Sequence, residues 1–206
     1  CGLYAQSSDN SGSNFKTGPG NYEILTINKE FVKIPFKMHR GKPPMEVKIN
    51  GEKATLMIDN GVLWDQVWLF GSQLVNKLDL KPDKAGELAG SESQESTDLY
   101  SSKNLKIAFE QIVFNEQPVL ISPESAGFTR IFPGVDGQLC NTFFKHFIVE
   151  FDFINNEIIL HQPKSFNYKG NGSILDMQLS ESGTYSIPFR MTLKNGKKYE
   201  DRADID

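Results

Sequence analysis

The sequence has few of the residues that build a metal centre or a disulfide framework. Only 2 of its 206 residues are cysteines and only 3 are histidines. The histidines lie far apart, and none has a second histidine or a carboxylate at the spacing of a metal-ligand motif. Two cysteines provide neither a zinc cluster nor the paired framework of a small secreted domain. We therefore expect no metal ion.

Long hydrophobic runs and a strong charge of one sign are also missing. No apolar run approaches the roughly 20 residues of a membrane-spanning helix. The chain has 22 lysines and arginines against 26 aspartates and glutamates, a net charge of −4 that is spread along the sequence. This balance argues against a nucleic acid or an anionic membrane as partner. With 38% hydrophobic residues, the chain can bury a sizeable core.

The sequence motifs that mark common nucleotide-binding sites and catalytic nucleophiles are absent as well. The sequence contains no GxGxxG, no GxxxxGK[ST] and no GxSxG. These patterns mark dinucleotide sites, nucleoside triphosphate sites and the nucleophile elbow of hydrolases. We therefore expect no cofactor, and any chemistry must come from other residues.

The N-terminal segment is rich in serine, glycine and asparagine and shows no strand or helix period, so residues 1–22 are predicted to be a flexible tether. A leading cysteine followed by such a tether resembles a mature bacterial lipoprotein, which implies a lipid anchor on Cys1. A second interpretation places the end of an ordinary signal peptide at Leu3-Tyr4-Ala5. Both predict an exported protein, periplasmic or anchored to the membrane. An arbitrary cut in a cytosolic chain is the third alternative.

From residue 24 onward, short alternating apolar runs bounded by glycine, proline and asparagine predict an all-β barrel or sandwich. Four Asn-Gly pairs favour tight turns between antiparallel strands. The polar segment 85–102 is either a mobile hairpin over a cleft or a solvated loop. The predicted strands cover residues 24–27, 31–34, 45–49, 105–109, 112–114, 119–121, 147–153 and 157–161.

Two short helices interrupt the predicted strands. Ser72 can cap a helix over residues 73–78, and Asn141 or Thr142 can cap a turn through residues 143–147. Before the first helix, Trp68 either lines a peptide-binding cleft or packs in the core. Cys140 has no basic partner near it in the sequence, and we expect a buried thiol.

An internal repeat divides the chain. The sequence KIPFKM at 33–38 recurs as SIPFRM at 186–191, and each copy is followed by an Asn-Gly pair and then an Ile-Asp pair. The first Ile-Asp pair ends at Asp59 and the second at Asp206, although a different register would select Asp204. The repeat predicts two related lobes. The first covers residues 23–165, and residues 166–206 hold a connector and the first strands of the second.

Two motifs within these lobes resemble those of the aspartic proteases of the retropepsin and pepsin type, especially bacterial two-lobed members. The first is the strand Leu56-Met57-Ile58 that ends in Asp59-Asn60-Gly61. The second is Asp136-Gly137-Gln138-Leu139-Cys140, followed by a short helix and a strand hairpin. The resemblance implies a retropepsin/pepsin-like acid-protease β-barrel lobe.

By this resemblance the protein is an aspartic-type endopeptidase whose substrate is a peptide or protein. Asp59 and Asp206 would be the two catalytic carboxylates, which lie close together, share one proton and activate a water molecule. Asn60 and Gly61 would form the active-site loop, and Gly61 suits its sharp bend. The second carboxylate would come from the second lobe of the same chain or from a second copy.

Two departures from the family pattern support an alternative. Asn60 replaces a threonine or serine whose hydroxyl ties the two active-site loops together. The family's hydrophobic-hydrophobic-Gly element becomes Gln138-Leu139-Cys140, in which Cys140 replaces a tightly packed glycine. The alternative is a catalytically inactive peptide- or protein-binding module of an exported lipoprotein. Taken alone, Asn60-Gly61 is also compatible with a plain hairpin turn.

Overall fold

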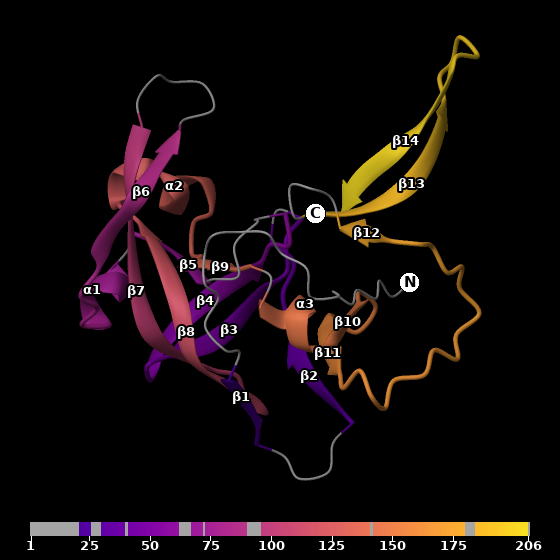
Figure 1. Cartoon of the computed structure of the whole chain (residues 1–206). Helices are drawn as coiled ribbons and strands as arrows, with labels where there is room; N and C mark the ends of the chain where they lie inside the picture. The colour runs from indigo at the N-terminus through magenta and orange to yellow at the C-terminus, as the bar shows by residue number, and fades with distance from the viewer. Residues whose placement is uncertain are drawn as a thin grey trace.

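A closed β-barrel forms the body of the protein in a computed structural model, which describes residues 21–25, 30–39, 41–61, 67–71, 73–89, 96–140, 142–179 and 184–205 (Figure 1). The strands of the barrel follow the order β8-β5-β9-β4-β3-β7, and pairing of β7 with β8 closes the ring. The prediction of an all-β fold is confirmed. The six strands are β3 (Pro44–Ile49), β4 (Glu52–Ile58), β5 (Val67–Phe70), β7 (Ser96–Ala108), β8 (Ile112–Ser122) and β9 (Gly137–Leu139).

Two further strands extend the barrel at its seam. Strand β1 (Asn21–Ile24) pairs with β8, and β6 (Asp83–Ala89) pairs with β7. The polar segment 85–102 therefore forms most of the β6–β7 hairpin, whose tip lies outside the described residues. The tether and Cys1 also lie outside them, so export and lipidation stay predictions.

Two three-stranded antiparallel sheets complete the fold. One contains β2 (Phe31–Pro35), β10 (Ile148–Asp152) and β11 (Glu157–His161). The other contains β12 (Gln178–Leu179), β13 (Tyr185–Thr192) and β14 (Lys198–Ile205). Figure 1 shows the β13–β14 hairpin rising from the same end of the molecule as the β6–β7 hairpin.

Both predicted helices are present, as α1 (Gln73–Lys77) and α3 (Thr142–His146). The structure adds a short 3-10 turn, η1 (Glu124–Ala126), and one turn of α-helix, α2 (Phe128–Ile131). Gly127 joins them in the left-handed conformation, with φ of 77°. Four residues are too few to show a helical period, so the sequence did not reveal α2. No helix in the described part of the chain is long and apolar enough to cross a membrane.

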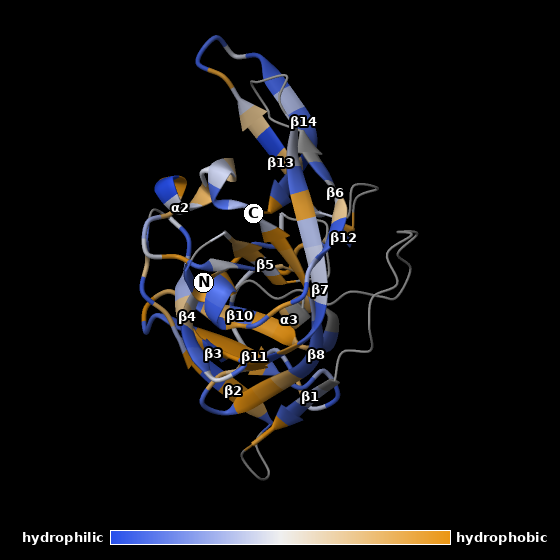
Figure 2. Ribbon diagram, turned by 90° about the vertical axis from the view of Figure 1, so that its left-hand side faces the viewer, coloured by the Kyte–Doolittle hydropathy of each residue, from blue (hydrophilic) through white to orange (hydrophobic). Residues whose placement is uncertain are grey.

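The core follows from the alternation of side chains along the strands. Leu56 and Ile58 point into the barrel, where they join a large aliphatic and phenylalanine cluster. The intervening Met57 points the other way, into a second cluster with Trp68 and Cys140. Trp68 is 7% exposed and Cys140 is fully buried, so Trp68 packs in the core and the prediction of a buried thiol is confirmed. In Figure 2 the hydrophobic strands gather in the body, and the β13–β14 hairpin projects from it.

The repeat corresponds to two β-hairpins. Asn50-Gly51 turns β3 into β4, and Asn195-Gly196 turns β13 into β14, as predicted for Asn-Gly pairs. Strand β4 ends directly before Asp59, whereas Asp204 lies inside β14, opposite Ser186. The pair at 171–172 lies outside any strand, where no partner strand exists for a hairpin. The assignment of 166–206 to a second lobe stays a prediction.

Candidate active site

Asp59 lies on the loop that leaves the end of β4. Its backbone N–H donates to the carbonyl of Leu139 on the neighbouring strand β9, at 3.2 Å. Because β9 separates β4 from β5, the next described strand after Asp59 does not pair with β4 as a hairpin would require. The hairpin pair Asn50-Gly51 has φ values of 49° and 94°, whereas Asn60 is not among the described residues with a positive φ. The plain-hairpin interpretation of Asn60-Gly61 is therefore wrong.

The carboxylate of Asp59 is surrounded by hydrogen-bond donors. Its Oδ1 accepts from the backbone N–H of Gly61 at 3.1 Å, and its Oδ2 accepts from the side-chain amide of Gln138 at 2.6 Å. The ammonium of Lys42 lies 3.9 Å from the same Oδ2. The Asp59 side chain is only 12% exposed. A backbone N–H, an amide and a nearby cation all favour the charged form of a carboxyl group.

A tight turn brings Lys42 to this carboxylate. The backbone groups of His39 and Lys42 exchange two hydrogen bonds, of 2.9 and 3.0 Å. Gly41 supplies the left-handed residue of the turn, with φ of 82°. The chain then enters β3, where Pro44 pairs with Met57, two residues before Asp59. Lys42 is thus held at the end of β4 by strand pairing.

Asn60 connects the loop to the far end of the chain. Its side-chain Nδ2 donates to the carbonyl oxygen of Ile205 at 2.7 Å, across 145 residues of sequence. Ile205 is the last residue of β14 and directly precedes Asp206. The structure therefore joins the residue after the first Ile-Asp pair to the isoleucine of the second. Asp206 itself lies outside the described residues.

The Asp-Gly motif before β9 positions this strand. The backbone N–H of Asp136 donates to the carbonyl of Thr55 at 2.8 Å, and the Asp136 carboxylate accepts from the N–H of Thr55 at 2.9 Å. A Cβ atom on Gly137 would lie 2.2 Å from the carbonyl oxygen of Trp68, so only glycine fits between β4 and β5. Both residues are structural, and together they place Gln138 beside Asp59.

Two residues of this site, Gln138 and Lys42, were not among the predicted site residues. A signal for Gln138 existed, because it is a polar residue where the family pattern has an apolar one. No such signal existed for Lys42, which is 17 positions before Asp59 in a polar turn. Only the pairing of β3 with β4 brings it close.

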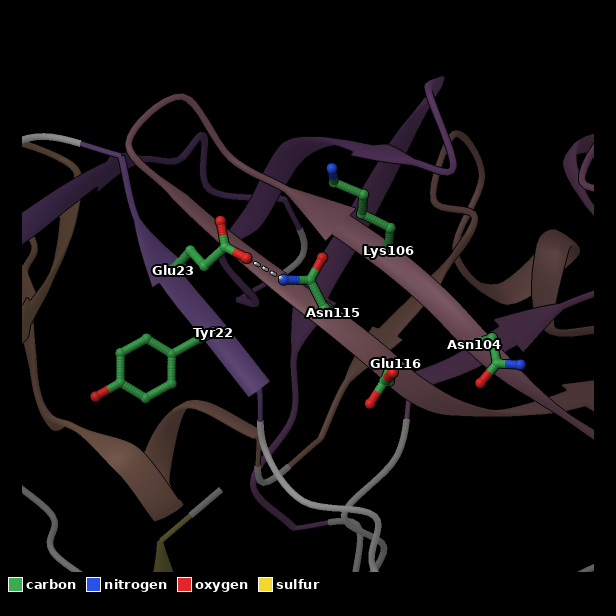
Figure 3. Close-up of a pocket in the computed structure, with 6 residues that line it drawn as sticks. All are labelled: Tyr22, Glu23, Asn104, Lys106, Asn115 and Glu116. Carbon is green, nitrogen blue, oxygen red and sulfur yellow. Dashed lines mark hydrogen bonds between the residues drawn. The ribbon is translucent and has the colours of Figure 1, made fainter.

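A separate surface pocket of about 540 Å³ lies over β1, β7 and β8 and shares no residue with the Asp59 site (Figure 3). Its lining is polar, and Glu23 there accepts a hydrogen bond of 3.1 Å from the amide of Asn115. Within the described residues, no group of three histidine, cysteine, aspartate or glutamate side chains could hold a metal ion.

No family model matches the chain, and no curated protein matches its sequence. Solved structures do match its fold. One is a retropepsin-like aspartic protease from Rickettsia conorii, with a TM-score of 0.44 and 12% sequence identity, and the match covers 70% of this chain and 96% of that one. The fold of this chain is similar to a retropepsin-like fold, and the similarity carries no information about residues or activity.

Proposed function

We propose that this protein is an aspartic-type endopeptidase in which Asp59 and Asp206 form the catalytic pair. The hydrogen bond from Asn60 to the carbonyl of Ile205 is the observation that supports it best. This contact joins the loop that carries Asp59 to the residue before Asp206. Two carboxyl groups presented by adjoining loops share one proton, which equips the pair to act as base and acid together.

The surroundings of Asp59 favour a role as the base. Its carboxylate receives hydrogen bonds from Gly61 and Gln138, and Lys42 adds a positive charge nearby. Asp59 would take a proton from a water molecule while the water oxygen attacks the carbonyl carbon of the peptide bond. The protonated Asp206 would donate its proton to the carbonyl oxygen. When the tetrahedral intermediate breaks its C–N bond, the proton held by Asp59 passes to the leaving nitrogen, and one hydroxyl of the intermediate returns its proton to Asp206 as the carboxylic acid forms.

The Asn60 amide weakens the argument for an inactive module. In the family that the sequence resembles, a hydroxyl at this position ties the two loops together. Here the Asn60 amide makes a contact of 2.7 Å with the carbonyl oxygen at the end of strand β14. The substitution therefore changes the chemical group and keeps a connection to the segment that precedes Asp206.

The test is a cleavage assay on the full-length protein with a library of extended peptides from pH 3 to pH 8, read by mass spectrometry. Asp59→Asn should reduce kcat/KM by about 10²–10⁴-fold. Asp79→Asn is the matched control, because Asp79 is exposed and has a positive φ of 47°, which asparagine tolerates. Folded wild-type protein that cleaves no peptide would refute the proposal. Peptide binding that survives Asp59→Asn without cleavage would identify a binding module.

A further inference from the structure

Gln138 carries a buried amide in strand β9, between Gly137 and Leu139. It is 6% exposed, and its register partners are Met57 on β4 and Trp68 on β5, both core residues. Its Nε2 donates to Asp59 Oδ2 at 2.6 Å. Among the described residues its Oε1 finds no hydrogen-bond donor. Within the part of the chain that the structure describes, the Gln138 side chain thus has a hydrogen-bond partner for its N–H group but none for its oxygen, and that partner is the candidate catalytic carboxylate.

Packing does not explain a glutamine at this position. A leucine or methionine would fill the same space beside Met57 and Trp68 and would bury no unsatisfied oxygen. A buried polar atom without a partner lowers the stability of a folded protein. Among the described hydrogen bonds, the side-chain amide of Gln138 makes none to the backbone of a neighbouring strand. Its contribution beyond that of an apolar side chain is therefore the hydrogen bond to Asp59.

A glutamine amide can serve either protonation state of a carboxyl group. Its N–H donates to a carboxylate, and after rotation about the last side-chain torsion its oxygen accepts from a protonated carboxyl. Both orientations fill the same volume, so the 2.6 Å contact can persist through a proton transfer. In the structure the N–H faces Asp59, which is the orientation for the ionised form.

Among the titratable groups on the elements around Asp59, the Lys42 ammonium favours its charged form, as Gln138 does. Lys42 approaches from the turn before β3, and His39 shares that turn. On the β9 side, Asp136 directs its carboxylate to the N–H of Thr55. Strand β5 carries no titratable side chain over Val67–Phe70, and Asp206 lies outside the described residues.

We propose that Gln138 is a positioning residue that keeps Asp59 ionised as the base. When Asp59 takes up the proton, the Gln138 amide rotates about its last side-chain torsion so that its oxygen faces the carboxyl group. The inference rests on the proposed function and adds a proton-responsive partner to it. The predicted consequence is a base that remains charged at lower pH than it would beside an apolar side chain.

The test measures the titration of Asp59 directly, by NMR of side-chain carboxyl carbons in the full-length protein, with Asp59→Asn identifying the signal. Gln138→Leu should raise the titration midpoint of Asp59 by about 1–2 pH units, the effect of removing one hydrogen bond to a charged group. Gln138→Met is the second variant. In the wild type, the side-chain amide signals of Gln138 should shift with the same midpoint as Asp59.

Gln117→Leu is the matched control. Gln117 is 4% exposed, and its amide donates to the carbonyl of Asn115 at 2.8 Å, away from Asp59. The control should leave the Asp59 titration unchanged. An unchanged midpoint of Asp59 in both Gln138 variants would overturn the proposal. So would side-chain amide signals of wild-type Gln138 whose chemical shifts do not change as Asp59 titrates.

The measurement is independent of the proposed function. If the protein cleaves no peptide but the midpoint moves as stated, endopeptidase activity is refuted and the coupling of Gln138 to Asp59 stands. If the protein cleaves peptides, the acid limb of kcat/KM in Gln138→Leu should move to higher pH by the same amount as the NMR midpoint. Cleavage with no movement of either would refute the role of Gln138 alone.

Discussion

The hydrogen bond from Asn60 to Ile205 should hold the end of β14 against the loop after β4. Asn60→Ala removes its donor and leaves the partly buried carbonyl of Ile205 without this partner. A neutral hydrogen bond contributes about 1 kcal/mol net. That energy corresponds to about a fivefold change in a local opening equilibrium.

The loss should appear in β14 and not in the barrel. Residues 191–201 of the β13–β14 hairpin are all exposed, so little buried surface holds this hairpin. One anchor to the body is Tyr185, which is 5% exposed and lies with its ring centroid 6.0 Å from that of Phe144. With the Asn60 contact removed, β14 should open more often while the barrel keeps its core.

Hydrogen exchange measured by NMR tests this reasoning. In Asn60→Ala the amides of β14 closest to Ile205 should exchange about fivefold faster, and the amides of β4 should be unchanged. Asn115→Ala is the matched control, because it removes an amide that donates to Glu23 at 3.1 Å on the β1–β8 edge. Unchanged exchange in β14 of Asn60→Ala would show that the contact does not hold the hairpin. If the protein is an endopeptidase, a loop misplaced by about 1 Å should also lower kcat by about 10²-fold.

Two other features give direct tests of stability. Gly137→Ala places a Cβ 2.2 Å from the carbonyl oxygen of Trp68, so unfolding free energy should fall by about 3 kcal/mol, and a wild-type Tm would contradict the close approach. Hydrogen bonds from Ser96 and then Lys84 lower the pKa of Glu87 in the β6–β7 hairpin. The ionised Glu87 therefore stabilises the hairpin at pH values above the pKa that Glu87 has in the unfolded chain. This stabilisation is lost as the pH falls through the lower pKa that Glu87 has in the folded protein. Exchange of hairpin amides should therefore accelerate below about pH 4.5, and Ser96→Ala should weaken this dependence.

The strands were predictable because local patterns determine them. Val32 and Ile34 in β2 alternate with exposed residues, and the observed burial follows that alternation. The Asn50-Gly51 turn was predictable for the same reason, since its positive φ values need only two adjacent residues. The same dipeptide at Asn60-Gly61 shows the limit of local inference, because β9 inserts beside β4 and removes the partner strand that a hairpin requires.

The site was predictable only in part because side chains reach it from distant segments. The motif identifies Asp59 as a candidate, but the contacts of its carboxylate with Lys42 and Gln138 depend on strand pairing across the barrel. The sequence also could not show the reach of the Asn60 amide, since that depends on where β14 ends. Helix α2 was missed because a single turn carries no period.

Asn60, Gln138 and Cys140 depart from the pattern of the family that the sequence resembles, and under the proposed function they would belong to a rebuilt site and not to a decayed one. A site that has lost its function is under no constraint to direct its new polar groups at particular atoms. Here the Asn60 amide meets the carbonyl before Asp206 at 2.7 Å, and the Gln138 amide meets the Asp59 carboxylate at 2.6 Å. Cys140 is fully buried in the cluster with Met57 and Trp68, so its thiol fills the core without exposing a polar group. Each replacement makes a specific contact, and two of the three contacts converge on the Asp59 loop.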